Sequence, residues 1–400
     1  MRIVLGVSAG IAAYKSCELL RLFTEAGHSV RVVPTADSLN FVGAATWAAL
    51  SGQPVTATAW DDVHEVPHVR IGQEADLVIV APATADLMAR AAAGMSGDLL
   101  TAVLLTARCP VVFAPAMHTE MWEHPATRAS AATLRGRGAI VLEPASGRLT
   151  GADTGPGRLP EPVSLFAAAL RAVARGSGGL APDLAGRQVL ISAGGTREDI
   201  DPVRYLGNRS SGRQGYALAS TAASRGAGVT LVAANTDLPD PAGVRVIRVT
   251  SARELREQVL AAAAAADCVV MAAAVADFRP ANRSEAKIKK TGAPPAPITL
   301  VENPDVLREL VATRPRPGQV IVGFGAETGD LLANGRAKLA AKGCDLLVVN
   351  QVGPGLAFGT SDNEAVVLSP DGQEIKVPRG PKEALADVVW DLVVARLSQA

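Results

Sequence analysis

The sequence predicts an α/β protein with two doubly wound parallel-sheet domains. At 400 residues the chain is longer than one hydrophobic core usually needs, so two domains of about 200 residues each are expected. Short β-branched runs alternate with Ala- and Leu-rich amphipathic stretches, which is typical of βαβ units around a parallel sheet. This alternation stops in the Gly- and Pro-rich segment 176–186 and then begins again. We therefore expect domains at 1–175 and 187–400, joined by a linker at 176–186.

The alternation predicts the elements of each half in turn. In the N-terminal half a helix is expected near 11–26, with strands at 2–7, 29–34, 76–82 and 110–115. In the C-terminal half helices are expected near 213–225 and 252–265, with strands at 187–195, 228–234, 267–274, 319–326 and 345–350. The Lys- and Pro-rich segment 279–300 and the Gly-rich segment 353–364 lack periodicity. Loops this long inside a compact domain usually serve a function, so both are expected to be lids or binding loops.

Composition excludes several classes of partner. Apolar residues make up 48% of the chain and charged residues 20%, and the net charge is zero, so the basic excess of a nucleic-acid-binding protein is absent. The first residues contain an apolar run too short for a bilayer and no signal-peptide pattern, so we expect a cytoplasmic protein without a membrane partner. The four cysteines, Cys17, Cys109, Cys268 and Cys344, are scattered without a CxxC pair, and we expect core or near-core residues rather than disulfides or a zinc site.

Polar and glycine-rich segments follow the expected strands of the N-terminal half. The stretch GVSAGIAAYK (6–15) places Ser8, Gly10 and the first amides of a helix where a phosphate would bind. The same turn is also compatible with a simple strand-to-helix connection, so this motif alone leaves both interpretations open. Three further segments, 81–100, 114–122 and 146–158, fall where open α/β sheets bind ligands, at the carboxyl ends of later strands.

Together these segments resemble the homo-oligomeric flavin-containing cysteine decarboxylases, which are Rossmann-like. They are most similar to the decarboxylase half of the bifunctional phosphopantothenoylcysteine decarboxylase/phosphopantothenate-cysteine ligase family. The resemblance implies FMN, whose oxidation of the substrate thiol provides the electron sink that decarboxylation needs. It places the FMN phosphate near Ser8, Gly10 and Ser38, and the ring against Ala83, Thr84 and Met95.

The resemblance also implies catalytic residues. His68 matches the family's active-site histidine, whose neutral imidazole can act as a base, although a lone loop histidine is more often a solvated side chain. His118 stands where the family has an asparagine that holds the substrate carboxylate. Gly151 stands where the family's flap carries the cysteine that protonates the ene-thiol. Asp153, Thr150, His118 or a water are the candidate replacements, or the reaction stops at the ene-thiol.

The most specific motif lies in the C-terminal half, at 191–219. One glycine turn, with Gly194 and Gly195, follows a strand, and a second, with Ser211 and Gly212, leads into a helix. Two sets of backbone amides can therefore face one polyphosphate. The GxGxxG fingerprint is absent, which argues against a nicotinamide-dependent dehydrogenase.

The likeness to the ligase half of the same family continues through 272–280, 287–290, 302–307, 323–328 and 338–342. It implies activation of the 4′-phosphopantothenate carboxylate by CTP and Mg²⁺ to an acyl-cytidylate, from which the L-cysteine amine displaces CMP. Asn208 matches the family's asparagine that holds this intermediate, and Arg204 matches a nearby arginine linked to the same step. Lys287 matches the lysine of the family's mobile loop, and Lys289 is its neighbour. No metal ligand is assigned, because Mg²⁺ is expected mainly on the nucleotide phosphates.

The residues matched to the nucleotide site are Gly194, Gly195, Ser211, Gly212, Met271, Ala272, Ala273, Asp277, Lys287, Pro304, Asp305, Val306, Leu307, Phe324, Lys338 and Lys342. Taken alone, the basic runs KIKK and KLAAK would read as solvated faces. The resemblance implies a homo-oligomer in which decarboxylase trimers are joined by ligase-domain dimers. The alternative is a ligase only, whose N-terminal domain is a flavin-binding scaffold or a regulatory module.

Overall fold

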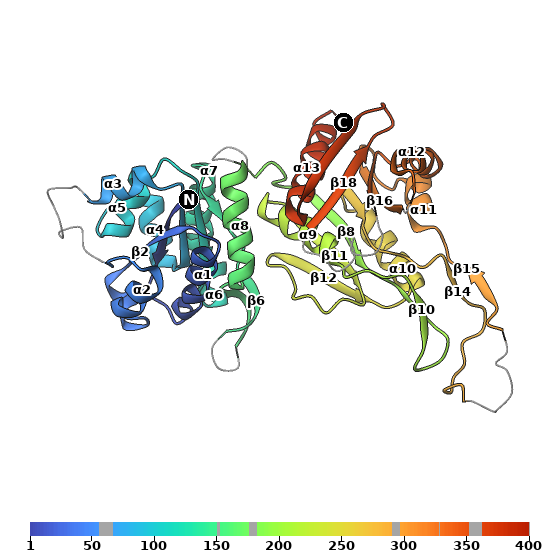
Figure 1. The fold of residues 1–400 in the computed structure, drawn as a ribbon, viewed down its shortest axis with the longest axis horizontal. Coiled ribbons are helices and arrows are strands. Elements are labelled where there is room, and N and C mark those ends of the chain that lie inside the picture. The colour runs from blue at the N-terminus through green and yellow to red at the C-terminus, as the bar shows by residue number, and fades with distance from the viewer. Residues whose placement is uncertain are drawn as a thin grey trace. The chain divides into compact units, whose positions relative to one another are not determined.

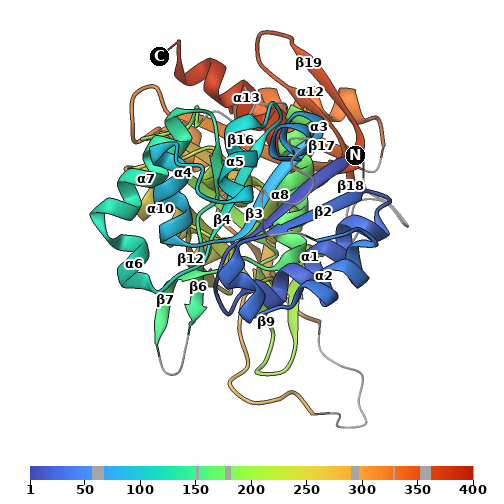
Figure 2. The same ribbon diagram turned by 90° about the vertical axis from the view of Figure 1, so that its left-hand side faces the viewer.

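The chain forms two compact units, Met1–Asp183 and Leu184–Ala400, each with its own sheet and core (Figures 1 and 2). The computed structural model describes residues 1–55, 67–149, 153–175, 182–289, 297–327, 329–351 and 362–399. Residues 176–181 of the expected linker lie outside this set, whereas Leu184 is fully buried in the core of the second unit.

Unit 1 contains a five-stranded parallel sheet in the order β2-β1-β3-β4-β5. Its elements are β1 (Arg2–Val7), α1 (Ala13–Glu25), β2 (Ser29–Pro34), η1 (Ala36–Asn40), α2 (Ala44–Ser51), α3 (Pro67–Glu74), β3 (Leu77–Ala83), α4 (Ala85–Ala93), α5 (Leu99–Thr106), β4 (Val111–Pro115), α6 (Thr119–Glu123), α7 (Pro125–Gly136), β5 (Ile140–Val141), β6 (Ala145–Arg148), β7 (Thr154–Arg158) and α8 (Pro162–Arg175). One core joins α1, α2 and α8 to the sheet, and another joins α3, α4, α5 and α7 to its other face. Every residue of β3 is buried, as expected for a strand covered on both sides.

Unit 2 contains an eight-stranded sheet in the order β12-β11-β8-β13-β16-β17-β18-β19. Its elements are β8 (Gln188–Gly194), β9 (Arg197–Asp199), β10 (Tyr205–Gly207), α9 (Arg213–Ser224), β11 (Gly228–Ala234), β12 (Val244–Val249), α10 (Ala252–Ala263), β13 (Cys268–Met271), β14 (Phe278–Pro280), β15 (Leu300–Glu302), α11 (Val306–Thr313), β16 (Val320–Glu327), α12 (Leu331–Lys342), β17 (Leu346–Gln351), β18 (Asp362–Leu368), β19 (Glu374–Pro381) and α13 (Lys382–Leu397). Helices α9 and α13 contribute to the core on one face, and α10, α11 and α12 to the core on the other. The hairpins β9–β10 and β14–β15 extend away from this sheet (Figure 1).

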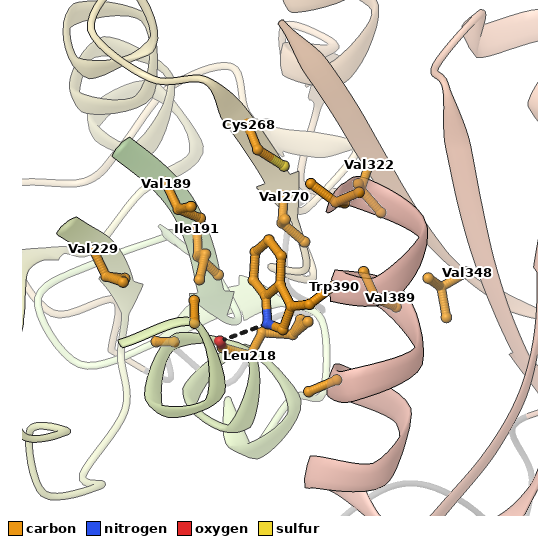
Figure 3. Close-up of a cluster of buried hydrophobic side chains, with 14 of the residues drawn as sticks. Val189, Ile191, Leu218, Val229, Cys268, Val270, Val322, Val348, Val389 and Trp390 are labelled. Carbon is orange, nitrogen blue, oxygen red and sulfur yellow. Dashed lines mark hydrogen bonds between the residues drawn. The ribbon is translucent and has the colours of Figure 1, made fainter. Parts of the chain in front are cut away.

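A tryptophan of the last helix occupies the centre of the core between α13, α9 and the sheet. Trp390 is fully buried, and its indole N–H donates to the carbonyl of Leu218 at 3.1 Å. Figure 3 shows the ring among side chains that include Val189, Ile191 and Val270 of the central strands. The aromatic ring therefore excludes water from this core while its one polar group remains satisfied.

The predicted fold class is confirmed, because both units have a parallel sheet with helices on both faces. Several elements were nevertheless not predicted. The sheet of unit 2 ends in the antiparallel strands β18 and β19, and the ends of segment 279–300 pair as β14 and β15. Residues 290–296 of that segment and 353–361 of the second expected loop lie outside the described residues.

Each sheet has a switch point where successive connections leave in opposite directions. In unit 1 it lies between β1 and β3, and in unit 2 between β8 and β13. Ligands of doubly wound folds bind beside such points, at the carboxyl ends of the strands. None of the helices described here is both long and apolar enough to span a bilayer.

Candidate active sites

The switch point of unit 1 is closed by a buried serine. The Ser8 hydroxyl donates to the carbonyl of Pro82 at 2.8 Å and accepts from the Thr84 amide at 2.9 Å, so it ties the end of β1 to the end of β3. Thr84 then starts α4, and its hydroxyl accepts from the Leu87 amide. The candidate residues Ser8, Ala83 and Thr84 are therefore brought together.

The first turn of α1 offers backbone donors beside this point. Its N-cap residue, Ala12, provides no side-chain cap, and no acidic residue lies in the first turn. A Cβ on Gly10 would meet no atom within 4 Å, so the loop faces open space. An uncapped helix start with room in front of it fits a phosphate.

The hydroxyls proposed for the phosphate are already engaged in the fold. Ser38 is fully buried and donates to the carbonyl of Thr35 at 2.7 Å, as Ser8 does to Pro82. The backbone amides at the start of α1 therefore fit a phosphate better than either hydroxyl does. Met95, expected at the flavin ring, follows α4 and is 53% exposed.

The hairpin β6–β7 lies against the carboxyl end of β4. The Met117 amide donates to the carbonyl of Gly157 at 2.9 Å. A Cβ on Gly157 would lie 2.2 Å from the Met117 carbonyl oxygen, so only glycine permits this approach. The contact brings the Asp153 carboxylate within 3.9 Å of Nδ1 of His118. Thr150 and Gly151 lie outside the described residues.

His68 lies elsewhere in unit 1. It belongs to α3, which packs against α5, and its carbonyl accepts from the Thr106 hydroxyl at 2.8 Å. Its Nδ1 is buried and has no hydrogen-bond partner among the described residues. Figures 1 and 2 both show α3 in the upper part of unit 1 and the β6–β7 hairpin in the lower part. One copy of the chain therefore does not bring His68 together with His118.

At the switch point of unit 2 the two glycine turns meet. Gly194 ends β8 at φ +85°, and a Cβ there would lie 1.9 Å from the carbonyl oxygen of Ala234. Gly212 precedes α9 at φ +74°, and its Cβ would lie 3.5 Å from the Cα of Gly194. Both positions require glycine, because a side chain would separate the turns. The start of α9 also has no side-chain cap, so its amides face the same place.

Asn208 lies next to these turns. Its side-chain amide donates to the carbonyl of Val275 at 2.9 Å, just beyond β13, and its own carbonyl would lie 2.5 Å from a Cβ on Gly195. The Ala273 amide donates to the Ser192 hydroxyl at 3.2 Å, which ties β13 to β8. Asn208 is thus held at the switch point by its side-chain amide.

The expected nucleotide residues differ in burial, and Ala272, Ala273, Leu307 and Phe324 are half-buried. Met271 and Val306 are buried, so only their backbone can face a ligand. Asp277, Pro304 and Asp305 are exposed near the strand ends. Among the described residues, no three His, Cys, Asp or Glu side chains are arranged to hold a metal.

The lysines of α12 do not form a solvated face. Lys342 pairs with Asp305, and Lys338 lies 3.7 Å from Glu327. Burial raises the pKa of the Asp305 carboxyl, but the bond from Lys342 and the Arg308 amide outweigh it, so that pKa is lowered overall. Both lysines are only partly exposed, because Lys338 lies beside Glu327 at the end of β16 and Lys342 pairs with Asp305 at the start of α11.

Two families match the chain, one for each half. The flavoprotein family matches residues 1–173, and the DNA/pantothenate metabolism flavoprotein C-terminal domain matches residues 184–397. The coenzyme A biosynthesis bifunctional protein CoaBC of Mycolicibacterium smegmatis is 59% identical over 99% of this chain and 98% of its own. This chain belongs to that family.

A second curated relative agrees with this assignment. The protein of the same name from Vibrio cholerae is 42% identical over 98% of this chain and 97% of its own. A crystal structure of the C-terminal domain of a CoaBC protein is 32% identical and covers 55% of this chain and all of that one, with a TM-score of 0.47. The two curated relatives and the two family models confirm the resemblance inferred from the motifs. The chain is a flavoprotein enzyme of coenzyme A biosynthesis with a ligase and a decarboxylase activity, and the full-length match does not favour the ligase-only alternative.

One buried acid of the ligase unit was missed by the sequence analysis. The Asp201 side chain is fully buried and accepts from the amides of Val203 and Arg204, from the Arg204 guanidinium at 2.8 Å, and from the Ile288 amide at 3.2 Å. It therefore holds the segment that carries Lys287 and Lys289. The signal was present in the sequence, because an Asp followed by Pro often starts a turn by accepting from amides two and three residues later.

Proposed function

We propose that this chain catalyses two consecutive steps of coenzyme A synthesis. Unit 2 joins 4′-phosphopantothenate to L-cysteine with CTP and Mg²⁺, and unit 1 decarboxylates the product, 4′-phosphopantothenoylcysteine, to 4′-phosphopantetheine with FMN. The observation that carries the proposal is the meeting of two glycine turns and an uncapped helix at the switch point of unit 2. That arrangement suits a nucleotide polyphosphate and adjoins the residue matched to acyl-nucleotide binding, Asn208.

The ligase step needs an activated carboxylate. A carboxylate oxygen attacks the α-phosphorus of CTP and pyrophosphate leaves, after which the cysteine amine attacks the acyl carbon and CMP leaves. Asn208 is proposed to hold the acyl-cytidylate, Arg204 to steady the same region, and Lys287 to neutralise charge that develops on the phosphate. Mg²⁺ is proposed to be held mainly through the nucleotide phosphates.

The decarboxylase step needs an electron sink. Bound FMN supplies it by oxidising the substrate thiol, so that the electrons of the departing carboxylate can move onto sulfur. The amides at the start of α1 are proposed to hold the FMN phosphate, with Ala83, Thr84 and Met95 against the ring. His118 is proposed to bind the substrate carboxylate and His68 to act as a base.

The proposed assembly is a homo-oligomer. His68 belongs to α3, which lies apart from the β6–β7 hairpin that contacts His118 (Figure 2), so the proposed site combines residues of different copies. Large apolar side chains that a neighbour would bury are exposed on unit 1, at Ile11, Tyr14, Phe41, Met95, Leu105 and Met121. On unit 2 they lie on or beside the two hairpins, at Val203, Tyr205, Leu206, Phe278, Leu300 and Val301. These surfaces support self-association. The proposed form of it is trimers of the decarboxylase unit joined by dimers of the ligase unit, in a cytoplasmic protein.

The proposal is tested by product analysis. The purified protein, checked for FMN absorbance, is mixed with phosphopantothenate, cysteine, CTP and Mg²⁺, and the products are measured by mass spectrometry. Formation of 4′-phosphopantetheine is expected. Accumulation of phosphopantothenoylcysteine would support the ligase-only alternative, and ATP replacing CTP at equal rate would refute the proposed nucleotide.

A further inference from the structure

We propose that His118 and Asp153 form the acid that completes decarboxylation, with His118 as the catalytic residue and Asp153 as its positioning residue. This inference rests on the proposed function of unit 1. It concerns the last half of that reaction, after carbon dioxide has left.

The chemistry requires an acid at one atom. Loss of carbon dioxide from the oxidised substrate leaves an ene-thiolate, in which the carbon that carried the carboxylate is doubly bonded to its neighbour. A proton must add to that carbon, which re-forms the carbon–sulfur double bond. Bound FMN would supply the hydride that reduces the carbon bearing sulfur. Without the proton the hydride has no acceptor, so the ene-thiol accumulates and the flavin stays reduced.

The structure places one histidine–carboxylate pair where this proton is needed. His118 follows β4 directly, at the end of the sheet where the flavin phosphate turn also lies, and Nδ1 of His118 is 3.9 Å from Oδ2 of Asp153. The separation exceeds a hydrogen bond, as catalytic contacts often do before substrate binds. A carboxylate beside Nδ1 stabilises the imidazolium form of the ring, whose second N–H, at Nε2, is the proton that we propose is donated.

The hairpin is fixed where Asp153 can reach the histidine. A Cβ on Gly155 would lie 2.3 Å from the Thr119 hydroxyl, and one on Gly157 would meet the backbone of Met117. At the far end, Arg158 donates to Glu161 at 2.6 Å, and Glu161 also accepts from Lys15 of α1 at 3.0 Å. The Leu149 amide donates to the carbonyl of Asp153 at 2.8 Å and closes the turn. Both ends of the hairpin are thus anchored to the site.

The same imidazole can serve twice. While the carboxylate is present, the ring binds it, and after carbon dioxide leaves, its N–H faces the carbon that has just lost that group. The Ser8 hydroxyl is a weaker candidate, because it already donates to the carbonyl of Pro82. The four cysteines, Cys17, Cys109, Cys268 and Cys344, all lie outside 146–158, so the hairpin has no thiol to offer.

The deciding experiment uses the full-length, flavin-loaded protein with phosphopantothenoylcysteine. His118→Asn is expected to release carbon dioxide while the ratio of ene-thiol to phosphopantetheine rises about 100-fold, the range of general acid catalysis. The ene-thiol is lighter by two hydrogen atoms, so mass spectrometry separates the two. The flavin absorbance should remain bleached in this variant, which is a readout independent of turnover.

A second variant tests whether the effect of His118→Asn comes from loss of the proton donor rather than from a distorted site. His118→Asn combined with Gly151→Cys supplies a thiol where the resemblance places the family's donor, and it should restore phosphopantetheine. Unchanged product ratio in His118→Asn, or loss of carbon dioxide release that Gly151→Cys does not restore, would overturn the proposal. Wild-type protein that releases no carbon dioxide would instead refute the proposed function.

The positioning role of Asp153 has its own test. Asp153→Asn should raise the ene-thiol fraction about ten-fold without lowering flavin content, and Asp153→Glu should restore most of the product. A purely structural role would lower carbon dioxide release and phosphopantetheine together and leave their ratio unchanged. That result would remove Asp153 from the proposed acid.

Discussion

The candidate sites at the two switch points differ in how many of their expected residues one copy of the chain brings together. In unit 2 the turns at Gly194 and Gly212 touch, and Asn208 lies beside them, so backbone contacts within one copy assemble the site. In unit 1 the phosphate turn is present, but His68 lies on α3, apart from His118 and the β6–β7 hairpin. One copy of the chain therefore brings together the residues proposed for the ligase site, but not all of those proposed for the decarboxylase site.

The substitution with the largest expected effect tests whether the two units unfold independently. Trp390→Ala should destabilise unit 2 by about 3–5 kcal/mol, because it empties the centre of the core and removes the bond to Leu218. Calorimetry of the full chain should show only one transition lowered. Trp47→Ala, which removes a fully buried indole bonded to Val42 in unit 1, is the matched variant and should lower the other transition. If either substitution lowered the temperatures of both unfolding transitions, the two units would not unfold independently.

A smaller change should separate the two activities. Gly194→Ala places a methyl group against the Ala234 carbonyl and should lower the ligase rate about 100-fold, since even a 1 Å displacement of a site can cost this much. Decarboxylation of added phosphopantothenoylcysteine should be unchanged. Gly372→Ala, also at positive φ but with nothing within 4 Å, is the control. Equal loss of both activities would contradict the separation.

Asp201→Asn should lower the ligase rate about ten-fold, because the amide nitrogen cannot accept from Arg204 and Ile288. Asp199→Asn, which alters only the surface pair with Arg283, should change little. Ligase rates at saturating CTP test this, with circular dichroism to confirm folding. Equal rates for the two variants would show that Asp201 does not position the lysine segment.

Asp201→Asn should also change how the free energy of unfolding depends on pH. Burial raises the pKa of the Asp201 carboxyl, but the three backbone amides and Arg204 outweigh it, so the folded pKa lies below the ordinary value of about 4. The stabilisation is therefore complete above about pH 4 and is lost as the pH falls through the lowered pKa. Urea titrations below pH 4 should show this loss in the wild type and not in Asp201→Asn. A greater loss of stability below pH 4 in Asp201→Asn than in the wild type would contradict the lowered pKa of Asp201.

The smallest effect concerns thiol reactivity. Cys268 and Cys344 of unit 2 are fully buried, whereas Cys17 and Cys109 of unit 1 are partly exposed. Burial raises the pKa of Cys344 to about 11, so about one thousandth of it is thiolate at pH 8. Iodoacetamide followed by peptide mass spectrometry should therefore modify the unit 1 cysteines first. Early labelling of Cys344 would show that unit 2 opens readily.

Much of the fold could be predicted because parallel strands covered on both faces are continuous apolar runs. Strand 228–234 was predicted with the bounds that the structure gives β11. The hairpin β6–β7 was not predicted, because its glycines have low strand propensity and serve close backbone approach. Strands β18 and β19 were missed because they form the antiparallel edge, outside the βαβ alternation.

The candidate sites were predictable only where backbone chemistry defines them. The glycine turns at 194 and 212 could be predicted from the sequence, because a glycine turn directly before a helix start is typical of an anion-binding site. The pairing of His118 with Asp153 is not, since it depends on how a hairpin packs against a distant strand end. Local patterns cannot contain that information, and Asp201 was missed although its turn signal was local.

The position of Trp390 also bears on the order in which the protein is made. The last helix, α13, supplies the ring that fills the core beneath β8 and β13, strands made long before it. Unit 1 has all of its elements once residue 175 has left the ribosome, whereas unit 2 must wait until the helix at 382–397 has emerged. During synthesis unit 1 can therefore fold while unit 2 still lacks the helix that completes its core.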